Sequence, residues 1–224
     1  MEKRNGLLLT SGGPDSTVLA YMLKQNNIDI SALVIKTDEE VGKFEEKKAS
    51  YFMNKLNIKL ETLDIIQAAT SIIYPTTQPI PITENFIPIN PFRGIPGEVP
   101  HFKNHHLAGE FGGTLFGLSI AIAYALQKGI DTIYYGIQGD DKDQFNENNR
   151  EYFETLSKLV EIETGKNFKI LTPLIEFSKS EVIKLGDTLG VELSKTHSCA
   201  DKIESHCGTC GSCKARKKAF IDNG

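Results

Sequence analysis

Short apolar runs typical of β-strands alternate along this chain with longer stretches of helical periodicity, and this alternation constrains the fold more than any other feature. The strand-like runs lie at residues 6–10, 30–36, 58–63, 132–136 and 168–171. Helical patterns lie at residues 15–24, 39–56, 114–128 and 150–163, and a capping box at residues 178–181 opens a further helix. The alternation predicts an α/β fold with a doubly wound, mostly parallel sheet, in which ligands bind beyond the carboxyl ends of the strands.

Prolines interrupt this alternation between Pro75 and Pro100, where seven of the nine prolines of the chain fall. Each proline removes a backbone N–H, so the segment is predicted to be neither helix nor central strand. We expect a long insertion at residues 75–112 that is either disordered or a lid over a binding site. His101, His105 and His106 lie within it, where surface imidazoles are the more common case and substrate contact is the alternative.

Charge and hydropathy argue against several classes of function. The net charge of −4 disfavours a broad basic surface for nucleic acid. A local basic cluster, Lys214, Arg216, Lys217 and Lys218, is interpreted as the solvated face of a helix. The apolar run at residues 115–126 is shorter than the about 20 residues that span a bilayer, and it is predicted to be a buried helix. Since no signal sequence is seen at the N-terminus, we expect a cytoplasmic protein without membrane contact.

Residues 11–16 read Ser-Gly-Gly-Pro-Asp-Ser and lie between the first strand and the first helix; we call them the glycine loop. Gly12 and Gly13 permit a tight turn with inward amides, Ser11 and Ser16 add hydroxyl donors, and the helix dipole adds positive potential. No lysine follows these glycines as in a Walker A loop, so the predicted ligand is a polyphosphate held in another way. Asp15 would repel that anion unless a cation lay between them, which predicts Mg²⁺. The alternative is that Asp15 or Ser16 only caps the helix.

All four cysteines fall near the C-terminus with the spacing Cys-x7-Cys-x2-Cys-x2-Cys. We call Cys199, Cys207, Cys210 and Cys213 the cysteine cluster. Four thiolates this close in sequence predict a tetrahedral structural zinc site, with an iron–sulfur cluster as the alternative. Disulfides are disfavoured in a cytoplasmic chain. His197 and His206 flank the cluster and are interpreted as bystanders, because four thiolates already complete a ligand set.

The glycine loop at the end of the first strand resembles the SGGxDS loop of the ATP pyrophosphatases. This superfamily has an adenine nucleotide alpha hydrolase-like, Rossmann-like fold and includes GMP synthetase, NAD synthetase and tRNA-thiolating enzymes. Its members cleave ATP between the α- and β-phosphates and adenylate an oxygen, so that a nitrogen or sulfur nucleophile can displace AMP. The resemblance implies that Asp15 and Ser16 act in catalysis. It implies a nucleotide-binding set of Thr10, Ser11, Gly12, Gly13, Asp15, Ser16 and Thr17.

The glycine loop and the cysteine cluster together, in a chain of 224 residues, resemble the 7-cyano-7-deazaguanine synthase family. Residues 118–125, 172–175, 177–186 and 196–199 are similar to further motifs of that family. The resemblance implies an ATP pyrophosphatase domain at residues 1–190 and a zinc-binding element at residues 191–224. It also implies a homodimeric ligase that uses ATP, Mg²⁺ and ammonia. Such an enzyme converts 7-carboxy-7-deazaguanine into a nitrile through an amide, for the tRNA base queuosine.

Two stretches depart from the family pattern and keep different functions open. Residues 108–113 lack the usual arginine and asparagine, for which His101, Lys103 or Arg93 are candidate substitutes, and Asn148 and Asn149 replace a cysteine and an arginine. One such function is that of a relative that transfers the adenylated acid to another amine, on a protein or a nucleic acid. A second is tRNA thiolation, and a third is that of a non-catalytic nucleotide-binding module.

Overall fold

The structure is a computed structural model that describes residues 5–73, 113–140, 149–199 and 205–223. In this part of the chain five strands form one sheet in the order β3-β2-β1-β4-β5, and every pairing is parallel. The strands are β1 (Asn5–Leu9), β2 (Asp29–Lys36), β3 (Leu60–Asp64), β4 (Thr132–Tyr135) and β5 (Lys169–Leu171). The predicted doubly wound α/β fold is therefore confirmed.

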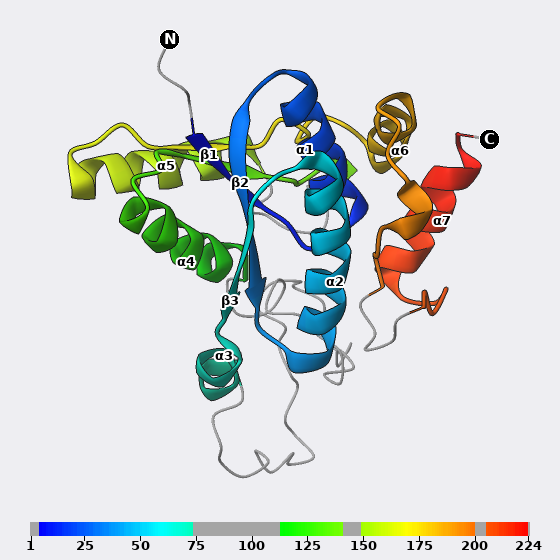
Figure 1. Ribbon diagram of the computed structural model, residues 1–224, viewed down its shortest axis with the longest axis horizontal. Helices are drawn as coiled ribbons and strands as arrows, with labels where there is room; N and C mark the ends of the chain where they lie inside the picture. The colour runs from blue at the N-terminus through cyan, green and yellow to red at the C-terminus, as the bar shows by residue number, and fades with distance from the viewer. Residues whose placement is uncertain (1–4, 74–112, 141–148, 200–204, 224) are drawn as a thin grey trace, which may run out of the picture.

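Helices cover both faces of this sheet (Figure 1). On one side lie α1 (Pro14–Gln25), α2 (Glu39–Leu56), α6 (Lys179–Thr188) and α7 (Gly211–Ile221); on the other lie α4 (Gly113–Gln127) and α5 (Arg150–Thr164). Successive strand residues point to opposite faces, so Leu8 joins the core under α1 and α2, whereas Leu7 joins the core under α4 and α5. Two short elements, α3 (Ile66–Ile73) and the 3₁₀ helix η3 (Leu193–Lys195), complete the described chain.

The strand order reverses direction between β1 and β4. The chain leaves β1 toward β2 and β3, but leaves β4 toward β5, so the connections that follow these two neighbours diverge. A crevice at such a switch point is where open parallel sheets bind their ligands. The glycine loop follows β1, and residues 136–140 follow β4, so both lie at the switch point.

Several predicted helix ends are set by side chains that satisfy free amides. The capping box is present in α6: Ser178 accepts the backbone N–H of Glu181, whose carboxylate accepts the N–H of Ser178. Asp38 caps α2, because its carboxylate accepts the backbone N–H groups of Glu40 and Val41. Asn149 caps α5 by accepting the N–H of Tyr152, which gives one departure from the family pattern a local structural role.

The helix expected to be wholly buried, α4, is buried along one stripe only. Leu118, Ala121 and Ala125 lie in the core, but the side chain of Leu115 is 47% exposed. The prediction was wrong for Leu115 because an apolar run carries no periodic signal for which face is covered. Within the described ranges, no helix is both long and apolar enough to cross a lipid bilayer.

Other sequence predictions lie outside the described residues. These are the insertion at 75–112 with His101, His105 and His106, the candidate substitutes Arg93 and Lys103, and Asn148. The division at residue 190 remains a prediction. Across it, α7 packs on α6 and places Ala219 in the same core as Leu8.

Candidate functional site

The glycine loop is closed by its own hydroxyl groups. The hydroxyl of Thr10 accepts the N–H of Gly12 at 3.2 Å and donates to Ser16 Oγ at 3.2 Å, and Ser16 Oγ donates to the carbonyl of Gly13 at 3.4 Å. The N-cap of α1 is Gly13, which has no side chain to cap it. Asp15 and Ser16 therefore lie inside the first turn, and the alternative that one of them caps the helix was wrong.

Two glycines allow neighbouring backbones to approach this loop. Gly12 has a φ of +70°, and a Cβ there would lie 2.4 Å from Lys48 Cβ and 2.6 Å from the backbone nitrogen of Ala49 in α2. Gly136, after β4, lies so close to α1 that a Cβ would be 2.9 Å from Ser16 Cα. Only glycine fits both positions without a shift of backbone, so the loop is held between α2 and the end of β4.

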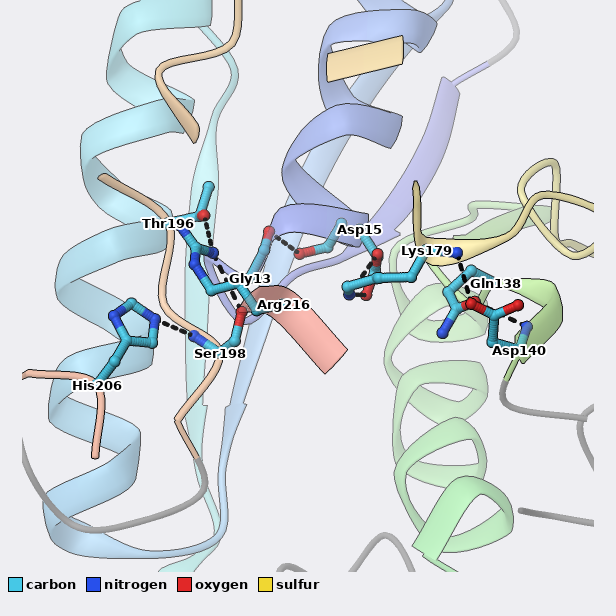
Figure 2. A network of polar contacts seen from close by, with 10 residues as sticks. Gly13, Asp15, Gln138, Asp140, Lys179, Thr196, Ser198, His206 and Arg216 are labelled. Atoms are coloured by element: carbon cyan, nitrogen blue, oxygen red, sulfur yellow. Dashed lines mark hydrogen bonds and ion pairs between the residues drawn. The ribbon is translucent and has the colours of Figure 1, made fainter. Parts of the chain in front are cut away.

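Asp15 forms an ion pair with Lys179, the first residue of α6 (Figure 2). The Lys179 Nζ atom lies 2.8 Å from Oδ1 and 2.6 Å from Oδ2 of Asp15, and the Lys179 and Asp15 side chains are 13% and 22% exposed. The predicted Mg²⁺ ligand therefore already faces a cation, and a divalent ion would compete with the ammonium group for the same carboxylate. The sequence predictions did not include Lys179 as a site residue, although it lies in the family-like stretch at residues 177–186.

The backbone around Lys179 is fixed by the loop that follows β4. The N–H of Lys179 donates to Asp140 Oδ2 at 2.9 Å, and the N–H of Asp140 donates to Gln138 Oε1 at 2.8 Å. Gln138 is buried. The loops after β1 and β4 and the start of α6 therefore meet in one polar network (Figure 2).

A segment from the C-terminal part of the chain closes the other side of the glycine loop. The N–H of His197 donates to the carbonyl of Gly12 at 3.2 Å. The His197 ring lies between Phe44 and His206, with ring centroids at 6.2 Å and 5.2 Å. His206 Nε2 accepts the N–H of Ser198 at 3.2 Å. Burial, and then the positive charge of Arg216, lower the pKa of His206, which favours this neutral acceptor form.

The cysteine cluster is assembled as predicted. The Sγ atoms of its four residues all lie within 4.8 Å of one another, and no disulfide joins them. The Cys207 and Cys213 sulfurs are 3.9 Å apart, close to the ~3.8 Å edge of a tetrahedron with Zn–S bonds of about 2.3 Å. The cluster therefore fits a zinc ion. His197 and His206 are not in this ligand set, but His197 is no bystander because its backbone holds Gly12.

Backbone amides surround the sulfurs. Cys199, Cys207 and Cys210 accept the N–H groups of Cys207, Cys210 and Cys213, respectively, at 3.3 to 3.4 Å. Burial, more than the neighbouring sulfurs, raises the pKa of Cys213 to about 12. The N–H donors therefore favour the ionised thiolate form of these cysteines, whereas burial favours the protonated thiol. A bound cation would add to the effect of the N–H donors and favour four thiolates.

Arg216 is buried, which corrects the prediction of a solvated basic helix face. Its guanidinium donates from Nη1 to Thr196 Oγ1 at 2.7 Å and to Ser198 Oγ at 3.2 Å, and from Nη2 to the carbonyl of Leu193 at 2.6 Å. The physical reason is helical spacing, because Cys213, Arg216 and Ala219 follow one another every three residues along the buried stripe of α7. Lys214, Lys217 and Lys218 are exposed, as predicted.

The remaining loop residues predicted to bind nucleotide lie as follows. Ser11 is half-buried at the surface of the loop, whereas the Thr17 side chain is fully buried in α1 and its Oγ1 has no hydrogen-bond partner within the described ranges. Thr17 thus flanks the loop from beneath. The Ser11 hydroxyl, the Gly13 N–H and the Lys179 ammonium group are donor types that suit a polyanion more than a neutral ligand.

Comparisons with solved structures place this geometry in a known fold. The chain is similar to NMN synthetase from Francisella tularensis, with a TM-score of 0.55 and 17% identity over 99% of this chain and 78% of that one. It is also similar to the NH3-dependent NAD synthetase from Campylobacter jejuni, with a TM-score of 0.50 and 14% identity over 87% of this chain and 68% of that one. At these identities the likeness shows the fold alone, which is of the adenine nucleotide alpha hydrolase-like kind.

Sequence comparisons show the family. The chain is 31% identical to a 7-cyano-7-deazaguanine synthase from a Nitratiruptor species over 96% of this chain and 92% of that protein. It is 30% identical to the protein of the same name from Campylobacter fetus over 97% of this chain and 92% of that protein. The family model of Queuosine biosynthesis protein QueC matches residues 110–224. The chain therefore belongs to this family of enzymes, the QueC family.

Proposed function

We propose that the protein is an ATP-dependent carbon–nitrogen ligase of queuosine biosynthesis that converts 7-carboxy-7-deazaguanine into 7-cyano-7-deazaguanine. The observation that carries the proposal is the polar network at the switch point, where the ion pair of Asp15 and Lys179 joins the glycine loop to the loop that follows β4. Relatives of nearly the same length are named for formation of that nitrile. Membership of the family supports the substrate, and the network supports the use of ATP.

The chemistry explains why such a site has to bind a triphosphate. A carboxylate resists attack by ammonia because its oxygen is a poor leaving group. Attack of that oxygen on the α-phosphorus of ATP breaks the bond to pyrophosphate and gives an acyl adenylate. Ammonia then forms the C–N bond, and AMP leaves with the oxygen to give the amide. A second adenylation, on the amide oxygen, lets the nitrogen lose its protons as AMP departs, which yields the nitrile and a second pyrophosphate.

The chain's own residues are well placed to stabilise the departing pyrophosphate. Amides of the glycine loop and the first turn of α1 offer donors at a helix N-terminus, where negative charge is favoured. Lys179 is a mobile cation at the edge of that site, and it can leave Asp15 for a phosphate oxygen when Asp15 takes another partner. Asp15 is the carboxylate that would hold Mg²⁺, and that ion when bound supplies charge neutralisation on the phosphates.

A product assay tests the proposal. The protein with ATP, Mg²⁺, ammonium and 7-carboxy-7-deazaguanine should release AMP and pyrophosphate and form amide and then nitrile, detected by mass spectrometry. We expect Asp15→Asn to lower turnover at least 100-fold, whereas Asp187→Asn, an exposed change on α6, should leave it within twofold. Release of ADP, or ATP cleavage to AMP without amide or nitrile, would refute the assignment.

The same assay distinguishes this function from the competing ones. Transfer to an amine on a protein or nucleic acid would appear as a deazaguanine-sized mass on that acceptor, and not as free nitrile. Thiolation of tRNA requires an electrostatic surface, and burial of Arg216 reduces the basic cluster to three exposed lysines. Little or no tRNA binding is therefore expected, even at low ionic strength. A homodimer, which the family resemblance implies, and the cytoplasmic location expected from the sequence are also parts of this proposal.

A further inference from the structure

Residues 193–199, which we call the linking segment, lie between the glycine loop and α7. On one side the N–H of His197 bonds the carbonyl of Gly12 at 3.2 Å, and a Cβ on Gly13 would lie 3.3 Å from the carbonyl of His197. On the other side three acceptors of the segment converge on Arg216, of which Figure 2 shows Thr196 and Ser198. The segment therefore contacts the loop with its backbone and α7 with its side chains and one carbonyl.

Arg216 is the group that gives the linking segment its shape. Its side chain is almost completely buried, at 9% exposure, and its three hydrogen bonds go to acceptors at positions 193, 196 and 198. Thr196, itself only 1% exposed, also donates to the carbonyl of Leu193 at 2.6 Å. Removing the guanidinium would leave Thr196 Oγ1, a buried acceptor, without its donor, although the carbonyl of Leu193 would keep the N–H and hydroxyl of Thr196. A buried acceptor that has lost its donor favours a rearranged backbone.

The position of Arg216 depends on the cysteine cluster. Helix α7 begins within the cluster, because Cys210 is its N-cap and accepts the N–H of Cys213. Arg216 lies one helical turn after Cys213. The linking segment also ends in the cluster, at Cys199, which is buried. A closed cluster therefore fixes both the helix that carries Arg216 and the end of the segment that Arg216 holds.

We propose that Arg216 is a positioning residue that makes the shape of the glycine loop depend on a closed cysteine cluster. It acts through the linking segment: the guanidinium sets the turn at Leu193 and Thr196, the turn places His197, and the N–H of His197 fixes the Gly12 carbonyl. The peptide group between Gly12 and Gly13 is then oriented to present its N–H, which belongs to Gly13, to an anion. The effect on nucleotide rests on the proposed function, whereas the effect on the loop itself does not.

The test compares Arg216→Ala with Lys217→Ala, an exposed neighbour on the same helix. Amide hydrogen exchange, read by mass spectrometry on peptides that contain Gly12, should rise at least tenfold in Arg216→Ala and stay within twofold of wild type in Lys217→Ala. The dissociation constant for ATP should rise about tenfold in the first variant and remain unchanged in the second. Arg216→Lys, which keeps the charge but offers fewer fixed donors, should restore part of both effects.

A matched destabilised variant separates positioning from loss of stability. Phe153 lies on α5, in the core on the opposite face of the sheet, and Phe153→Leu should lower the melting temperature without changing exchange at Gly12. If Arg216→Ala does not fold, Thr196→Val, which removes a single acceptor of similar shape, should give a smaller increase in the same exchange. Equal exchange at Gly12 in wild type, Thr196→Val and Arg216→Ala would overturn the proposal.

The dependence on the cluster is tested by a double-mutant cycle with Cys207→Ser. If the cluster and Arg216 act through one path, their effects on exchange at Gly12 are not additive, and the double variant resembles the stronger single variant. Fully additive effects would refute the link to the cluster. If wild-type protein binds no ATP, the proposed function fails, while the exchange measurements still decide whether the loop depends on Arg216.

Discussion

Replacement of Gly12 by alanine tests whether the glycine loop is held against α2 as the structure has it. The residue has a φ of +70°, and its missing Cβ would lie 2.4 Å from Lys48 Cβ and 2.6 Å from the nitrogen of Ala49. The left-handed conformation costs an alanine about 1–2 kcal/mol. The contact with helix backbone cannot be relieved by a rotamer change, and overpacking of this kind costs about 1–3 kcal/mol more. We therefore expect Gly12→Ala to lower the free energy of unfolding by about 2–5 kcal/mol.

Gly165 provides the matched control for that prediction. It has a φ of +68°, but among the described residues no atom outside its immediate chain neighbours lies within 4 Å of the position its Cβ would occupy. Gly165→Ala therefore has the conformational cost without the steric one, about 1–2 kcal/mol. Urea unfolding followed by circular dichroism suits both variants, since the chain has no tryptophan for fluorescence. If the free energy of unfolding falls equally in the two variants, within about 0.5 kcal/mol, Gly12 does not lie as close to α2 as described.

Three further predictions concern charges and sulfurs. Burial, and then the charge of Asp38, raise the pKa of Glu45 from 4.5 to about 7, so the folded state holds this proton more tightly than the unfolded chain. As pH rises from about 4.5 to 7, the free energy of unfolding of the wild type should therefore fall by about 1–3 kcal/mol relative to that of Glu45→Gln. Urea unfolding at pH 4 and 8 measures this, and the same difference in free energy between the two proteins at both pH values would contradict the prediction. Lys179→Met should raise the inhibition constant of pyrophosphate for ATP cleavage at least tenfold, whereas Lys184→Met, on the exposed side of α6, should not. Equal inhibition constants in the two variants would show that Lys179 does not contact the bound anion. Cys207→Ser should abolish one tightly bound zinc, measured by elemental analysis of a colourless wild-type protein, and brown protein would favour the iron–sulfur alternative.

The order of strands and helices was predictable because it depends on local periodicity. The sequence predictions for strands at 30–36 and 132–136 lie within one residue of β2 and β4 at each end. The capping box opens α6 as predicted, since its two hydrogen bonds join residues only three apart. The cysteine cluster was predictable for a related reason: closely spaced thiolates near the chain end have few other roles. Helix α3 was not predicted, because its eight residues are fewer than the window of about 11–18 residues in which helical periodicity is recognised.

The contacts that complete the site were not predictable in the same way. Asp15 and Lys179 are 164 residues apart, and no local pattern states that the start of α6 returns to the glycine loop. The same holds for His197, whose backbone rather than its ring contacts Gly12. Burial of Arg216 runs against the usual preference of arginine for the surface, and it is explained by acceptors on the linking segment that only the folded chain brings together.

The wide separation between Asp15 and its partner also has a consequence for how the protein is made. A ribosome adds about 5–20 residues per second, so the glycine loop emerges roughly 8–30 s before Lys179 has been synthesised. During that interval β1 and α1 can form only with partners that precede α6. The nascent chain therefore exposes an incomplete anion site with an unpaired carboxylate, and chaperones or premature ligands that bind this stage would meet a surface that the finished enzyme no longer has.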